Sequence, residues 1–132
     1  MLKKAAQKEL LKVLETRNYN TYNHRHNDFR RKTIKKKLQS ESQISKKLAK
    51  RLHGLTEVIT PAGRIDILTS TELIEVKQVK DWKEAVGQVI IYGKYYPSHW
   101  NRIHLFGLCH SSYLKLIENH CQEINIKVSV EN

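Results

Sequence analysis

Three short runs rich in β-branched residues, separated by two tight turns, constrain the fold more than any other feature of this sequence. Each run is the length of a strand, and the connections between them carry the Pro, Gly and Ser residues of turns. Strands joined by such short connections lie next to one another, so the sequence predicts a three-stranded meander. The predicted strands cover residues 57–60, 64–69 and 73–79.

The chain after the meander alternates between helical and strand periodicity. The pattern predicts a helix over 82–95, a buried strand over 103–108, a helix over 111–121 and an edge strand over 124–130. The apolar face of the first of these helices consists of Trp82, Ala85, Val86, Val89, Ile90 and Gly93. This order of elements predicts an α/β fold with a mixed sheet flanked by helices.

Three helices are predicted before the meander. They cover residues 3–16, about 28–38, and a segment that begins at a capping box of Ser40 and Gln43, runs through Leu52 and is stopped by Gly54. A length of 132 residues is typical of one domain. We therefore divide a single domain, 1–132, into a first helix (1–16), a basic helical insert (17–54) and an α/β core (55–132).

The positive charge is concentrated in one part of the chain. Its formal net charge is +11, yet residues 17–51 alone carry twelve Lys or Arg against two acidic residues, whereas residues 52–132 carry eight basic and nine acidic ones. Such clustering favours contact with a nucleic acid, although a solvated or solubilising surface would carry the same charges. The residues expected to contact phosphate are Arg30, Arg31, Lys35, Lys36, Lys46, Lys47 and Lys50.

The composition excludes several classes of protein. An apolar fraction of 39% is too high for a wholly disordered chain, and no run approaches the roughly 20 apolar residues of a membrane span. The N-terminus lacks the apolar segment of a signal peptide, and two cysteines do not make a disulfide framework. We expect a protein that is cytoplasmic or nucleoid-associated and not secreted.

Two carboxylates and one ammonium group fall within the otherwise apolar meander. Asp66 lies on the second predicted strand, and Glu75 and Lys77 lie two residues apart on the third, so they share a face of that strand. Buried charges are costly unless they are paired or bind a metal. An ion pair would account for one acid and Lys77. Two carboxylate ligands with open positions suit Mg²⁺, and Lys77 would then orient a nucleophile and stabilise developing negative charge.

These residues also carry a resemblance to a known family. Gly63-Arg64-Ile65-Asp66 followed by Glu75-Val76-Lys77 resembles the PD-(D/E)xK nuclease superfamily, in which an Asp on one strand precedes Asp/Glu-x-Lys on the next. Ile65 stands where the family often has Pro. In the next helix, Gln88 and Tyr92 are similar to the Gln-x-x-x-Tyr motif of the RecB-like and lambda-exonuclease-like branch.

The resemblance implies a restriction-endonuclease-like αβββαβ core and a metal-dependent DNA endonuclease of the small stand-alone type, a group that includes junction resolvases and homing, restriction and mobile-element enzymes. It implies catalytic roles for Asp66, Glu75, Lys77, Gln88 and Tyr92. Mg²⁺, or Mn²⁺ in its place, would be held by Asp66, Glu75 and the backbone carbonyl of Val76. A further ligand would come from Glu9, Glu15, His53 or Glu57. Members commonly dimerise, so the implied partners are DNA and a second copy of the chain.

Two other interpretations stay open. The chain could be a non-catalytic nucleic-acid-binding module that retains the nuclease fold, or a basic RNA-associated protein in which the acids form a structural ion pair. A zinc site is disfavoured, because a helix of about ten residues would hold Cys109-His110 and His120-Cys121 roughly 15 Å apart, whereas zinc bonds are about 2.0–2.3 Å.

Overall fold

The computed structural model describes residues 41–132, which belong to one compact unit. The helices predicted over 3–16 and 28–38 lie outside the described residues. So do the predicted phosphate contacts Arg30, Arg31, Lys35 and Lys36. Within the described part of the chain, no helix is both long and apolar enough to cross a membrane.

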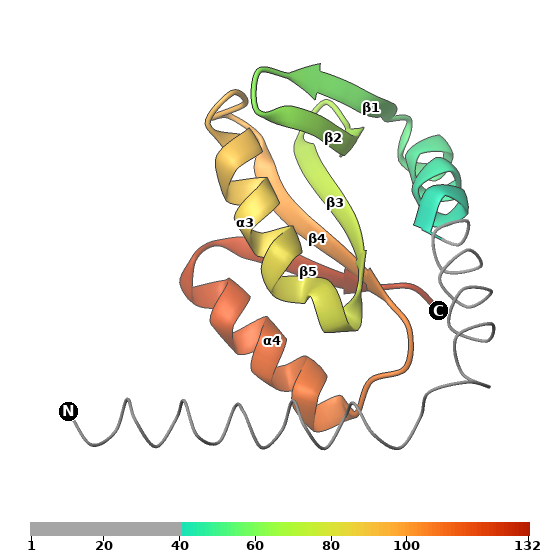
Figure 1. Cartoon of the computed structure of the whole chain (residues 1–132), viewed down its shortest axis with the longest axis vertical. Helices are drawn as coiled ribbons and strands as arrows, with labels where there is room; N and C mark the ends of the chain where they lie inside the picture. Colours follow the sequence, from blue (N-terminus) through green and yellow to red (C-terminus); the bar gives the residue numbers. More distant parts are fainter. Residues whose placement is uncertain (1–40) are drawn as a thin grey trace, which may run out of the picture. The chain divides into compact units, whose positions relative to one another are not determined.

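The described residues form an α/β fold with one five-stranded mixed sheet, as the sequence predicts (Figure 1). A helix covers residues 41–52. The elements that follow are β1 (Leu55–Thr60), β2 (Gly63–Leu68), β3 (Glu72–Gln78), a 3-10 turn (Val79–Asp81), α3 (Trp82–Gly93), β4 (Trp100–Phe106), α4 (Ser111–Glu123) and β5 (Ile126–Val130).

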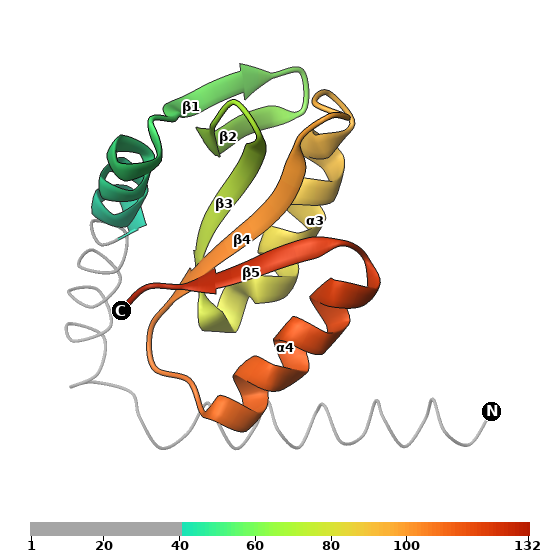
Figure 2. The same cartoon turned by 180° about the vertical axis from the view of Figure 1, so that it is seen from behind.

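The strands lie in the sheet in the order in which they occur in the chain. β1, β2 and β3 pair antiparallel, which confirms the meander, and β4 and β5 continue the sheet in parallel with β3. Each parallel step needs a crossover, which α3 and α4 provide. Crossovers of one hand place their helices on the same face of a sheet, which is where α3 and α4 lie (Figure 2). Both helices pack into one core cluster.

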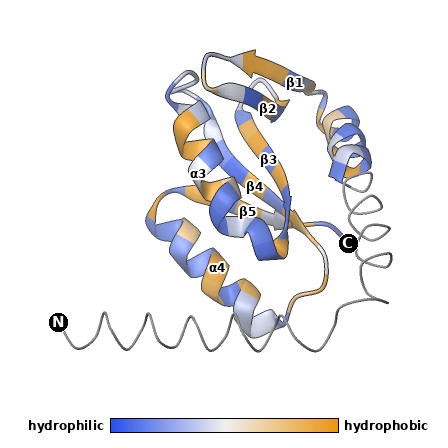
Figure 3. Cartoon of the chain, in the orientation of Figure 1, coloured by the Kyte–Doolittle hydropathy of each residue, from blue (hydrophilic) through white to orange (hydrophobic). Residues whose placement is uncertain are grey.

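The sheet separates two hydrophobic clusters. The larger one joins the α3 and α4 face through fully buried residues such as Ile65, Leu73 and Ile103. The smaller one joins the helix over 41–52 to the opposite face, where Leu48 and Ala49 pack with Ile67, Ile74, Val76 and Phe106. Figure 3 shows the apolar residues concentrated along β1 and β3 and mixed with hydrophilic ones along α3 and α4. The core therefore holds helices against both faces of the meander.

The helix over 41–52 ends at Leu52, as the sequence predicts, and the residue after it forms the cap. His53 takes the left-handed conformation, with φ 55°. The Gly54 N–H then donates to the carbonyl of Ala49 at 2.8 Å, and the His53 N–H donates to that of Lys50 at 3.4 Å. These are the two bonds of a Schellman motif. The helix thus ends where the sequence predicts, but His53 rather than Gly54 takes the left-handed position of the cap.

Two further predictions are corrected by the burial pattern. Ile90 was expected on the buried face of α3, but it is 44% exposed, and Tyr92 takes its place in a stripe with Trp82, Ala85 and Val89. The buried strand predicted over 103–108 ends at Phe106, because Gly107 has φ 102° and Leu108 is fully exposed. The strand begins earlier than predicted, at Trp100, because the polar residues Asn101 and Arg102 do not show the pattern of a buried strand.

Candidate functional site

Asp66 and Glu75 lie where the pairing between β2 and β3 stops. The register between these strands consists of Ile67 with Ile74 and Leu68 with Leu73. Next to it, the Asp66 N–H donates to Oε1 of Glu75 at 3.2 Å, and the Val76 N–H donates to Oδ2 of Asp66 at 2.8 Å. Each carboxylate thus takes a backbone N–H that would otherwise belong to the strand ladder. This exchange holds the two acids side by side, as the sequence predicts.

Glu75 is the most buried acid of the described residues, at 2% exposure. Its burial, and then the neighbouring charge of Asp66, raise the pKa of the Glu75 carboxyl to about 9, while Lys77 lowers it. At neutral pH the folded protein therefore favours a proton on this group. A bound cation would satisfy the same electrostatic demand, because it removes the repulsion between the two carboxylates.

Lys77 does not form a simple ion pair with either of these acids. Its Nζ lies 3.5 Å from Oε1 of Glu41 and 3.8 Å from Oε1 of Glu84. Burial opposes the charge of the ammonium, but the carboxylates of Glu41, Glu84 and Asp66 outweigh it and raise the pKa of Lys77. The ammonium is thus held at the end of β3 by one helix from each side of the sheet.

Glu41 is the member of this charged cluster that sequence reasoning missed. It lies in the helix over 41–52, and its carboxylate accepts a hydrogen bond from Lys77. Burial raises the pKa of Glu41 and the charge of Asp66 adds to this, against the opposing effect of Lys77. One signal could have revealed it: Glu41 is one of only two acidic residues in the basic stretch 17–51, and it lies in the first turn of a predicted helix.

Tyr92 closes the site from α3. Its side chain is 8% exposed, and burial followed by the charges of Glu75 and Asp66 raises the pKa of the phenol. A Cβ atom at position 63 would lie 2.5 Å from the Tyr92 hydroxyl, so Gly63, with φ 140°, is required at the start of β2. Gln88, one turn earlier, has a buried Oε1 with no hydrogen-bond partner among the described residues.

The other predicted ligands do not join this cluster. Glu57 has φ 53° and an exposed side chain, and His53 is exposed at the end of its helix. Neither makes a hydrogen bond or ion pair within residues 41–132 to the acids of β2 and β3. Glu9 and Glu15 lie outside the described residues. Lys46, Lys47 and Lys50 are all exposed on the helix over 41–52, as expected for phosphate contacts.

The carboxylate oxygens of Asp66 and Glu75 suit a hard cation, although two carboxylates alone do not complete its coordination. The bonds described above engage one oxygen of Asp66 and one of Glu75, and oxygen ligands are those that Mg²⁺ prefers. Over residues 41–132, no three acidic, His or Cys side chains are grouped as metal ligands. Cys121 is buried in the core, and the His120 ring stacks on Trp82.

Comparison with known proteins finds relatives but no defined family. No family profile matches the sequence, and no solved structure does. The chain is 36% identical over 92 residues to the KilA-N domain-containing protein L33 of Acanthamoeba polyphaga mimivirus, which covers 70% of this chain and 37% of L33. It is 32% identical over 90 residues to the KilA-N domain-containing protein R878 of the same virus, covering 68% of this chain and 25% of R878. The chain thus spans about a third of these relatives or less.

The raised pKa of Glu75 predicts how stability depends on pH. Between the ordinary pKa of a carboxyl near 4.5 and the folded-state value of about 9, the folded state binds more protons than the unfolded state. The free energy of unfolding should therefore fall as the pH rises from 5 to 9. Denaturant unfolding of metal-free protein across this range measures it. Glu75→Gln should flatten the decline, and the exposed control Glu57→Gln should not; equal slopes in all three proteins would contradict the buried, protonated carboxyl.

Proposed function

We propose that this chain is a DNA-binding domain. The observation that carries the proposal is its similarity to viral KilA-N domain-containing proteins, since KilA-N domains bind DNA. The matched stretch is about a third of those proteins or less. Their names therefore describe whole proteins, of which this chain shares only a part. The clustered positive charge gives an independent physical reason to expect a polyanionic partner.

The helix over 41–52 offers part of a surface for the DNA backbone. Leu48 and Ala49 turn toward the sheet and are 3% exposed, whereas Lys46, Lys47 and Lys50 are exposed. One side of the helix is thus fixed to the core and the other presents three ammonium groups to solvent. Lysines held in this way contact phosphates without sequence preference.

Neutralising these lysines tests their role. Replacing Lys46, Lys47 and Lys50 by Ala should reduce the slope of log affinity against log salt for duplex DNA by about two to three units, because three phosphate contacts are lost. Fluorescence anisotropy at several salt concentrations measures the slope. A control that replaces the exposed Lys83, Lys94 and Lys115 removes the same charge from other elements. Equal slopes for the two triple variants would assign the helix to a solvated surface.

A second function, hydrolysis of phosphodiester bonds, is favoured by the cluster around Asp66. The described elements follow the order helix, three strands, helix, strand, which suits the restriction-endonuclease-like core. Asp66, Glu75 and Lys77 lie close together, and the charges of the two acids act on Tyr92 of α3. We therefore propose that the DNA-binding domain also cleaves DNA; otherwise it is a binding module that retains the nuclease architecture.

The residues have separate roles in this second proposal. Asp66, Glu75 and the Val76 carbonyl would hold Mg²⁺, which supplies a water of lowered pKa and screens negative charge at phosphorus. Lys77, held by Glu41 and Glu84, would donate hydrogen bonds to the attacking water and the phosphate oxygens. The unpartnered Gln88 carbonyl oxygen and the Tyr92 hydroxyl would position groups at the edge of the site.

Cleavage assays separate the two functions. Wild-type protein should cut linear, branched or single-stranded DNA in the presence of Mg²⁺ or Mn²⁺, and Asp66→Ala and Lys77→Ala should abolish cleavage but still bind DNA. The control Glu123→Ala removes an exposed carboxylate at the end of α4 and should cleave normally. Absence of cleavage by the wild type on every substrate, with binding retained, would leave the DNA-binding module as the function.

A further inference from the structure

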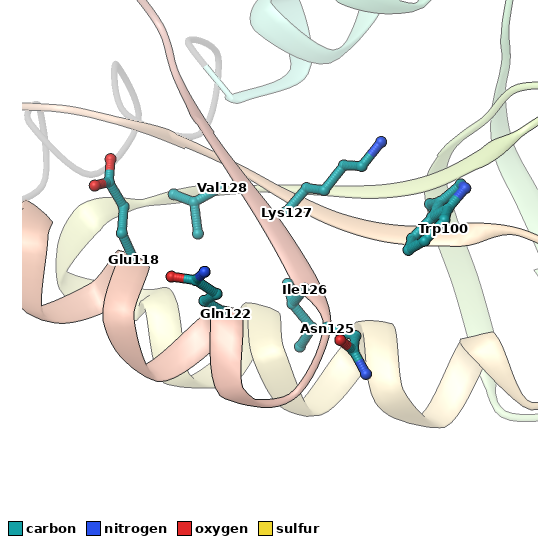
Figure 4. A pocket seen from close by; sticks show the side chains of 7 residues that line it. All are labelled: Trp100, Glu118, Gln122, Asn125, Ile126, Lys127 and Val128. Atoms are coloured by element: carbon teal, nitrogen blue, oxygen red, sulfur yellow. The ribbon is translucent and has the colours of Figure 1, made fainter.

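A pocket of about 300 Å³ lies away from the Asp66 cluster, at the amino ends of β4 and β5 (Figure 4). Trp100 is the first residue of β4 and pairs with Glu72 at the start of β3, whereas Glu75 and Lys77 pair with Ile103 and Leu105 further along. The pocket thus occupies the other end of the parallel strands. It is bounded by β5, which is the edge of the sheet, and by the last turns of α4.

The pocket combines an exposed aromatic ring with a cation. The Trp100 indole is 56% exposed, which is unusual for the largest apolar side chain. The Nζ of Lys127 lies 5.1 Å from the centroid of the ring. A flat aromatic ligand that carries a negative group would satisfy both, by pairing with the ammonium and stacking on the indole face from which it draws the ammonium away.

The opposite wall supplies hydrogen-bonding groups and the opposite charge. Gln122 of α4 and Asn125 of the following turn bring side-chain amides to the pocket, each able to donate and accept. Glu118 lies at the end of the pocket away from Trp100 in Figure 4. A phosphate is repelled from the Glu118 end and attracted to the Lys127 end, so the charges orient a nucleotide with its base inward.

We propose that this pocket binds an unpaired base of DNA, stacked on Trp100 with its phosphate at Lys127. The base must be unpaired, because a base inside a duplex has no free face to offer the indole. The amides of Gln122 and Asn125 then contact the exposed edge of the base. This inference rests on the proposed DNA binding and deepens it, since it gives the domain a preference for single-stranded or locally opened DNA.

The experiment compares a single-stranded oligonucleotide with the matching duplex. When the wild type binds the single strand, the fluorescence of Trp100 should be quenched. The buried Trp82 should contribute a constant background to the signal. Trp100→Ala should weaken single-strand binding about tenfold and duplex binding less than twofold. Trp100→Phe, which keeps an aromatic ring, should have a single-strand affinity between those of the wild type and Trp100→Ala. Tyr95→Ala, which removes a 46% exposed ring outside the pocket, should match the wild type.

The outcomes separate this inference from the function on which it rests. If the wild type binds neither form of DNA, the proposed function and the pocket assignment both fail. If the wild type binds DNA and Trp100→Ala binds the single strand as tightly, the assignment of the pocket fails alone. An equal loss on both forms of DNA would also overturn it, because the indole would then contribute only to a general surface.

Discussion

The structure depends on an exchange of hydrogen bonds between side chains and backbone at the junction of β2 and β3. Asp66 and Glu75 each accept a backbone N–H from the neighbouring strand, directly beyond the last paired residues, Ile67 and Ile74. Carboxylates that replace ladder bonds hold their position with the accuracy of the sheet itself. The same bonds bring two negative groups together in a place with little water, which costs free energy until a proton or a cation is present.

The surrounding elements are arranged around this costly pair. The helix over 41–52 and α3 lie on opposite faces of the sheet, and each contributes a carboxylate, Glu41 or Glu84, that holds Lys77. Gly63 leaves the space into which the Tyr92 hydroxyl fits. A charged cluster held by helices on both faces of a sheet is typical of functional sites. Apolar residues in the same positions would stabilise the fold at a lower cost in desolvation free energy.

Local sequence signals predicted the elements, and tertiary contacts decided what they could not. The meander and the α/β class follow from β-branched runs and turns, and Asp66, Glu75 and Lys77 follow from charges within those runs. Glu41 was missed because its partner lies 36 positions later and no local pattern joins them. Ile90 was misplaced because the sequence of α3 offers both Ile90 and Tyr92 as apolar residues near its buried face. Only packing against the sheet decides that Tyr92 is the buried one. Gly54 was expected to cap the helix over 41–52, because a left-handed histidine is rare beside an available glycine, but His53 takes that conformation.

The proposal that Asp66 and Glu75 would hold a divalent cation has its most direct measurement in thermal stability as a function of Mn²⁺ or Mg²⁺ concentration. Binding to the folded state alone should raise the Tm of the wild type progressively, in proportion to the logarithm of the metal concentration above Kd. Glu75→Gln, which keeps the shape of the side chain but cannot carry its charge, should lose that rise. An equal rise in both proteins, or none in the wild type, would contradict the account.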